Sequence, residues 1–155
     1  MSLHWPIGGS NFTPAYQISG IPFVTSSVDN ELTNAGNVVR IEFPFITSTI
    51  RIEASGSTSG TANSAIIRYG FTENGVNSNP NANYGFVNTN GGTNYSTPDM
   101  PIRCKELFLR WDAGTNRTAV GFTVVAGLTN IPSSNFPTLT GSINGVDIPM
   151  HEGVG

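Results

Sequence analysis

Two stretches of this sequence settle its fold class: IRCKELFLRW at residues 102–111 and TAVGFTVVAG at residues 118–127. Apolar and polar residues alternate in both, and alternation with a period of two is typical of β-strands. The segment between them, DAGTN at residues 112–116, predicts a hairpin loop. In the first strand Lys105, Leu107, Leu109 and Trp111 share one face and Cys104, Glu106, Phe108 and Arg110 the other; in the second, Val120, Phe122, Val124 and Ala126 share a face.

Outward from these two strands, clusters of Gly, Pro and Asn cut the chain into further short β-branched and aromatic runs. Helical periodicity is almost missing. Asn74-Gly75 and Asn90-Gly91 predict tight turns, and Pro44 interrupts a strand because proline cannot donate to a sheet ladder. Further strands are predicted at residues 21–27, 38–43, 48–54, 65–72, 84–88 and 136–143, the last at a sheet edge. About eight short strands predict an all-β fold, a two-sheet antiparallel β-sandwich that is jelly-roll-like, with extended terminal arms.

A chain of 155 residues predicts a single domain. We expect the β-sandwich domain at residues 15–140, an N-terminal arm at 1–14 and a C-terminal tail at 141–155. Both ends carry apolar residues without strand rhythm, so they either fold back over an open sheet edge or pack on a neighbouring subunit. In the second case the partner-binding residues of the N-terminal arm are Leu3, Trp5, Ile7 and Phe12.

Charge is scarce in this chain. Asp, Glu, Lys and Arg make up 11% of it, whereas Asn, Ser, Thr and Gly together supply 67 residues. A net charge of −3 argues against nucleic acid as a partner, because phosphate binding needs clustered Lys and Arg. There is no apolar run long enough for a membrane-spanning helix, and the first ten residues lack the features of a secretory signal. One cysteine excludes an internal disulfide, so we expect folding in a reducing cytosol.

The sequence contains few residues that could form a catalytic site. The two histidines, His4 and His151, lie in the terminal segments, and Cys104 is expected to be a buried, inert thiol. These residues offer neither a nucleophile triad nor a zinc site. Glu42 and Glu53 are expected on the outward faces of successive strands, beside Arg40 and Arg51, so a cross-strand surface charge pattern explains them, although a carboxylate-only site stays open. We expect a protein that is not an enzyme and has no cofactor and no metal.

An Asn-rich stretch at residues 73–100 contains three aromatic residues, Tyr84, Phe86 and Tyr95. One interpretation is that Tyr84 and Phe86 anchor a long loop on the core. The other is a ligand-binding loop, because exposed aromatic rings stack on sugars and Asn side chains suit hydroxyl groups. A carbohydrate-binding, lectin-like β-sandwich is therefore the alternative function.

The segments AYQISGIPFVTSS (15–27), RCKELFLRW (103–111) and VVAGLTNIPSSNFPTLTGS (124–142) resemble the small virion structural proteins of tailed bacteriophages, most of all capsid decoration (cement) proteins. The similarity is one of style along the whole chain, so no functional residue is carried over from it. The resemblance implies a β-sandwich on the outer capsid surface that is made in the host cytoplasm and forms a homo-oligomer, a dimer or a trimer. It also implies a terminal arm that contacts the major capsid protein. A tail, neck or fibre accessory subunit fits the same features.

Overall fold

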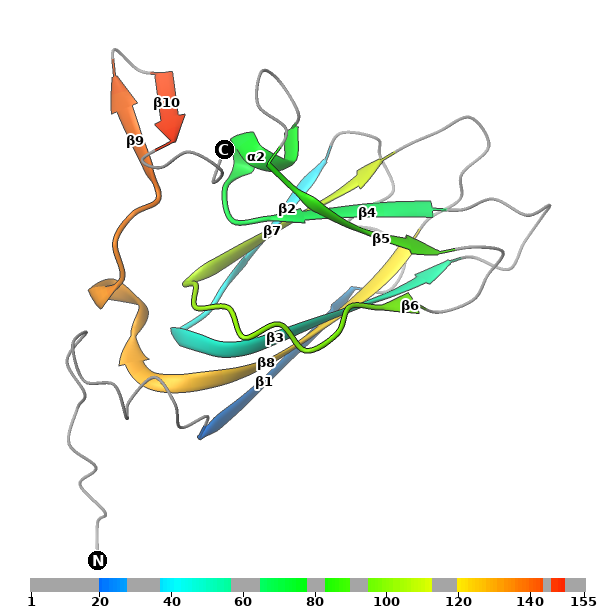
Figure 1. The fold of residues 1–155 in the computed structure, drawn as a ribbon, viewed down its shortest axis with the longest axis horizontal. Helices are drawn as coiled ribbons and strands as arrows, with labels where there is room; N and C mark the ends of the chain where they lie inside the picture. The colour runs from blue at the N-terminus through cyan, green and yellow to red at the C-terminus, as the bar shows by residue number, and fades with distance from the viewer. Residues whose placement is uncertain are drawn as a thin grey trace, which may run out of the picture.

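The computed structural model describes residues 20–27, 37–56, 65–77, 83–89, 95–112, 120–143 and 146–149. Two four-stranded antiparallel sheets face one another in it, which confirms the predicted β-sandwich (Figure 1). Sheet I has the order β1 (Ile21–Ser27), β8 (Val120–Pro132), β3 (Phe45–Gly56) and β6 (Tyr95–Ser96). Sheet II has the order β2 (Val38–Glu42), β7 (Glu106–Asp112), β4 (Ala65–Gly70) and β5 (Gly85–Thr89).

The strand pairing is nested, as in a long hairpin that has been folded over. β1 pairs with β8, β2 with β7, β3 with β6 and β4 with β5. The pairs β3–β8 and β4–β7 connect these four strand pairs and so complete the two sheets. Eight strands wound in this way form a jelly roll, so the jelly-roll prediction is confirmed.

The predicted hairpin at residues 112–116 is wrong. The strands on either side of it, β7 and β8, lie in different sheets, so the connection crosses between the two layers. Both strands alternate because both line the same core, and alternation reports the buried face but not the pairing partner. The end of the chain differs as well. β9 (Thr140–Ile143) pairs with β10 (Val146–Pro149) and is not an edge strand of the sandwich.

A short helix occupies the predicted turn at Asn74-Gly75. α2 (Glu73–Asn77) begins after Thr72, whose hydroxyl accepts a hydrogen bond from the Gly75 backbone N–H at 3.1 Å. A threonine in this position caps a helix N-terminus. The helix packs on the outer face of sheet II, where a Cβ on Gly70 would lie 2.8 Å from Val76 Cγ1.

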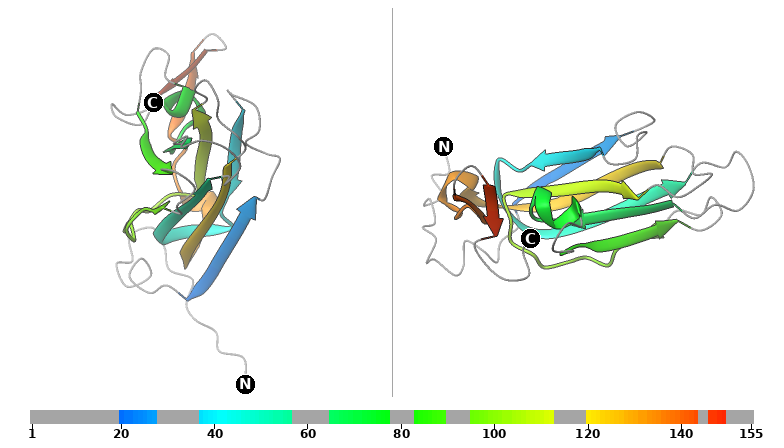
Figure 2. Two further views of the ribbon diagram at one scale, coloured as in Figure 1. Left: turned by 90° about the vertical axis from the view of Figure 1, so that its right-hand side faces the viewer. Right: turned by 90° about the horizontal axis from the view of Figure 1, so that it is seen from above.

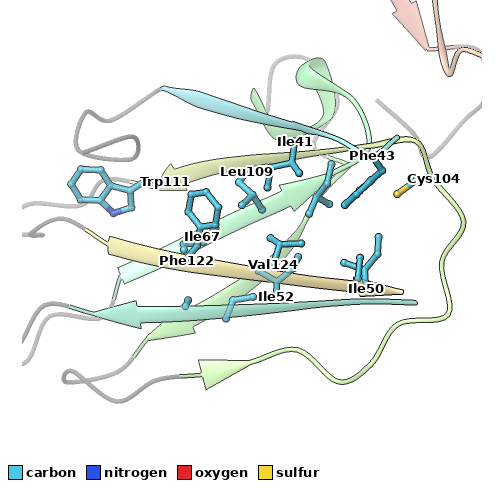
Figure 3. Close-up of a cluster of buried hydrophobic side chains, with 14 of the residues drawn as sticks. Ile41, Phe43, Ile50, Ile52, Ile67, Cys104, Leu109, Trp111, Phe122 and Val124 are labelled. Atoms are coloured by element: carbon cyan, nitrogen blue, oxygen red, sulfur yellow. The ribbon is translucent and has the colours of Figure 1, made fainter. Parts of the chain in front are cut away.

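The core lies between the sheets and follows the period-two pattern of the strands. Leu109 and Trp111 of β7 meet Ile52 of β3 and Val124 of β8 there (Figure 3). Cys104 belongs to the same core, so its predicted placement on one face with Phe108 is wrong. The reason is that β7 begins at Glu106, and the strand alternation does not extend back to residue 102.

The β9–β10 hairpin stands beyond one end of the sandwich, next to α2 in the view from above (Figure 2). Among the described residues neither of its strands pairs with a strand of sheet I or sheet II. No helix in the described ranges is long and apolar enough to cross a membrane.

Candidate ligand-binding site

The two sheets come together at one lateral edge of the sandwich. β5, the edge strand of sheet II, lies against β6 and β3 of sheet I (Figure 1). A pocket of about 450 Å³ opens there, and we call it the seam pocket. Its lining consists of Tyr69, Phe86, Val87, Asn88, Tyr95, Ser96, Thr97 and Pro98.

Two of the three aromatic residues named from the sequence line this pocket. Phe86 is 64% exposed and Tyr95 is 44% exposed, which makes them, with Val24, the most exposed large apolar residues of the described chain. Phe86 alternates with the buried Val87, so its side chain lies on the solvent side of β5. The interpretation that Phe86 anchors a loop on the core is therefore wrong.

Tyr84 does not line the seam pocket. It is half-buried, and the guanidinium of Arg68 lies 4.4 Å from the centroid of its ring. A cation in this position is attracted by the negative face of the ring. Tyr84 therefore has a structural contact of its own.

Tyr69 is a wall of the pocket that the sequence did not reveal. It lies directly opposite Gly85 in the pairing of β4 with β5, and a Cβ on Gly85 would overlap its ring. Glycine at position 85 thus gives the tyrosine ring room to lie across the edge strand. The cross-strand pairing that would have revealed this contact is not visible in a single sequence.

The other wall is fixed to β3 through Thr97. Its backbone N–H donates to the Ile52 carbonyl at 2.9 Å, and its hydroxyl accepts from the Ile52 N–H at 3.0 Å. Asn88 and Ser96 are exposed beside it. The lining contains no charged residue, so it offers aromatic surface together with neutral hydrogen-bonding groups.

A second hollow, of about 560 Å³, lies beside β2 and β7 on the outer side of sheet II. Arg40 borders it and holds two carboxylates, with Nη2 at 2.7 Å from Glu106 and at 2.8 Å from Glu42. The same guanidinium lies 6.0 Å from the ring centroid of Phe108. The positive charge of Arg40 is already balanced by the carboxylates of Glu42 and Glu106, so we assign this hollow to the surface ion network.

The structure does not bring Glu42 and Glu53 together. β2 and β3 are consecutive in sequence but belong to opposite sheets, and both carboxylates lie on outer faces. Each is held by an arginine of its own strand, Glu53 by Arg51 at 3.1 Å. The expected charge pattern across these two strands is therefore wrong, because each of these Arg–Glu pairs lies within a single strand, and a catalytic pair of Glu42 and Glu53 is wrong for the same reason.

Cys104 is a buried thiol, as expected, with 1% of its surface exposed. Burial raises the pKa of this thiol to about 11, so the thiolate is scarce at neutral pH. Within the described ranges no three His, Cys, Asp or Glu side chains form a metal-binding group. His4, His151 and the arm residues Leu3, Trp5, Ile7 and Phe12 lie outside the described residues.

Comparison with known proteins gives no relative: a scan against protein-family models finds no match, and a search of curated proteins finds no significant one.

Proposed function

We propose that this chain is a structural subunit of a virion, a capsid decoration (cement) protein that binds the assembled shell and forms a homo-oligomer. The observation that carries the proposal is the β9–β10 hairpin, whose strands pair with neither sheet among the residues that the structure describes. A two-stranded hairpin on its own is marginally stable in water. A neighbouring subunit that covers the hairpin would stabilise it.

The hairpin sequence supports this role. Ile143, Val146 and Ile148 belong to β9 and β10, and Val146 lies opposite Ile143 in the register. Apolar residues of this kind are costly to leave in water. Packing of the hairpin on another protein surface would bury these apolar residues, and this burial favours association.

One lateral edge of the sandwich is also suited to association. β1, an edge strand of sheet I, and its neighbour β8 contain no charged residue. Val24 of β1 is 63% exposed. Edge strands usually carry charges or other devices that prevent pairing with another chain, and β1 has only Pro22. An uncharged edge favours contact with a like subunit or with a shell protein.

The jelly roll itself is neutral between the candidate functions. It occurs in viral capsid proteins, in lectin domains and in cupins, so a fold of this kind does not select one activity.

The proposed mechanism is mass action. A subunit that binds only the assembled shell stabilises it by about 2.7 kcal/mol at a hundredfold excess over Kd, and symmetric copies repeat this gain over the particle.

The virion part of the proposal is tested on particles from the culture in which the chain occurs naturally. Intact particles are purified on a density gradient, and their proteins are identified by mass spectrometry. We expect this chain in the particle fraction at many copies per particle, together with the major capsid protein. Recovery of the chain only in the soluble fraction would contradict the proposal, and recovery with isolated tails would assign it to the tail, neck or fibres.

A further inference from the structure

We propose that the seam pocket binds a neutral saccharide, with Phe86 and Tyr95 as the residues on which the sugar packs. This function is independent of assembly, because the pocket lies at the β5–β6 edge and the proposed assembly contacts lie on β1 and on the β9–β10 hairpin. The pocket combines exposed aromatic surface, a lining without charged residues and walls that are held in place.

The first step is the exposed aromatic surface. Phe86 and Tyr95 come from two different sheets and border one pocket of about 450 Å³. Phe86 is 64% exposed and Tyr95 is 44% exposed although a jelly-roll core lies next to them. Exposed apolar surface in a pocket with a few polar groups is typical of a ligand site. The apolar C–H face of a sugar ring fits such a surface.

The second step is the chemistry of the polar groups. Asn88 presents an amide that both donates and accepts hydrogen bonds, and Ser96 presents a hydroxyl with the same capacity. Sugar hydroxyls also donate and accept, so the two sets match. A charged ligand would meet no opposite charge in this lining and would lose its hydration there. The lining therefore selects a neutral, hydroxyl-rich ligand.

The third step is preorganisation of the walls. Tyr69 lies over Gly85, and Thr97 is held to Ile52 by two hydrogen bonds of 2.9 and 3.0 Å. Walls held in this way lose little freedom when a ligand binds, which favours affinity.

The experiment is a calorimetric titration of the full chain with a panel of neutral oligosaccharides: cello-, malto-, galacto- and chito-oligosaccharides. A charged oligosaccharide, oligogalacturonate, serves as the comparison ligand. We expect binding of at least one neutral oligosaccharide and none of oligogalacturonate. The variants Phe86→Ala and Tyr95→Ala should each weaken binding about tenfold, and together more.

Thr49→Ala is the control, because Thr49 is exposed on β3 of sheet I but lies outside the pocket lining and outside the proposed assembly contacts. Its affinity for the sugar should equal that of the unmodified chain. No binding to any neutral oligosaccharide at millimolar concentration overturns the proposal. So does binding that survives the double variant or that Thr49→Ala weakens to the same extent. Scattering mass measured on the same samples reports assembly separately, so the two proposals fail independently.

Discussion

At the scale of single residues, the buried hydroxyls explain how an irregular part of the sandwich is tolerated. Register shifts interrupt the β3–β8 pairing around Thr47, where a regular ladder is lost. The Thr47 hydroxyl donates to the Ile102 carbonyl at 2.7 Å and accepts from the Cys104 N–H at 2.9 Å. It thus satisfies backbone groups of the non-strand segment that precedes β7, in a position with no exposed surface.

We predict that Thr47→Val lowers the free energy of unfolding by about 3 kcal/mol, because valine keeps the shape but leaves a buried donor and acceptor without partners. Urea denaturation followed by fluorescence measures the change. Thr49→Val is the control, since Thr49 is exposed on the same strand, and its effect should stay within about 0.5 kcal/mol. Equal losses in the two variants would show that the Thr47 hydroxyl has no special role.

At the candidate site, the sequence singled out some of the lining residues and missed others. Phe86 and Tyr95 stand out in an Asn-rich stretch, and the structure places both on one pocket. Tyr69 does not stand out, because it lies two residues after the buried Ile67, on the same face of β4, as a core residue would. Its role in the pocket depends on Gly85 across the strand pair, and such a pairing is a long-range property of the fold.

At the scale of elements, strand positions follow from local patterns, whereas the partners of the strands do not. The predicted strand at 21–27 agrees with β1, and Pro44 separates β2 from β3 as expected. The side chains of Leu109 and Val124 point to the core as predicted. That β7 and β8 lie in different sheets is decided by which strands can bury their faces together, and a period-two pattern is the same in either case.

The β9–β10 hairpin is the element on which association depends in this account. We predict that Ile143→Pro, which removes the strand donor opposite Val146, abolishes self-association of the full chain while the sandwich stays folded. Ile143→Val is the matched control and should associate normally. Sedimentation velocity measures association, and circular dichroism measures the fold. An Ile143→Pro chain that associates as the unmodified chain does would remove the hairpin from the interface.

At the scale of the whole molecule, the distribution of charge and of apolar surface points to association. Few charges mean weak repulsion between copies, and the β1 edge of sheet I has the exposed Val24 and no charged residue. The low charge follows directly from the amino-acid composition, and the alternation of apolar and polar residues along the strands predicted the two sheets. The sequence did not predict that β9 and β10 pair apart from the two sheets. An apolar segment has the same sequence pattern whether it covers its own sandwich or a neighbouring subunit.

The central claim, that this protein acts by binding to copies of itself and to a larger shell, is tested most directly by the mass of the purified full chain in solution. Light scattering coupled to size exclusion gives that mass over a range of concentrations. The account predicts two or three times the chain mass of 16.4 kDa. A mass of 16.4 kDa at every concentration would contradict it.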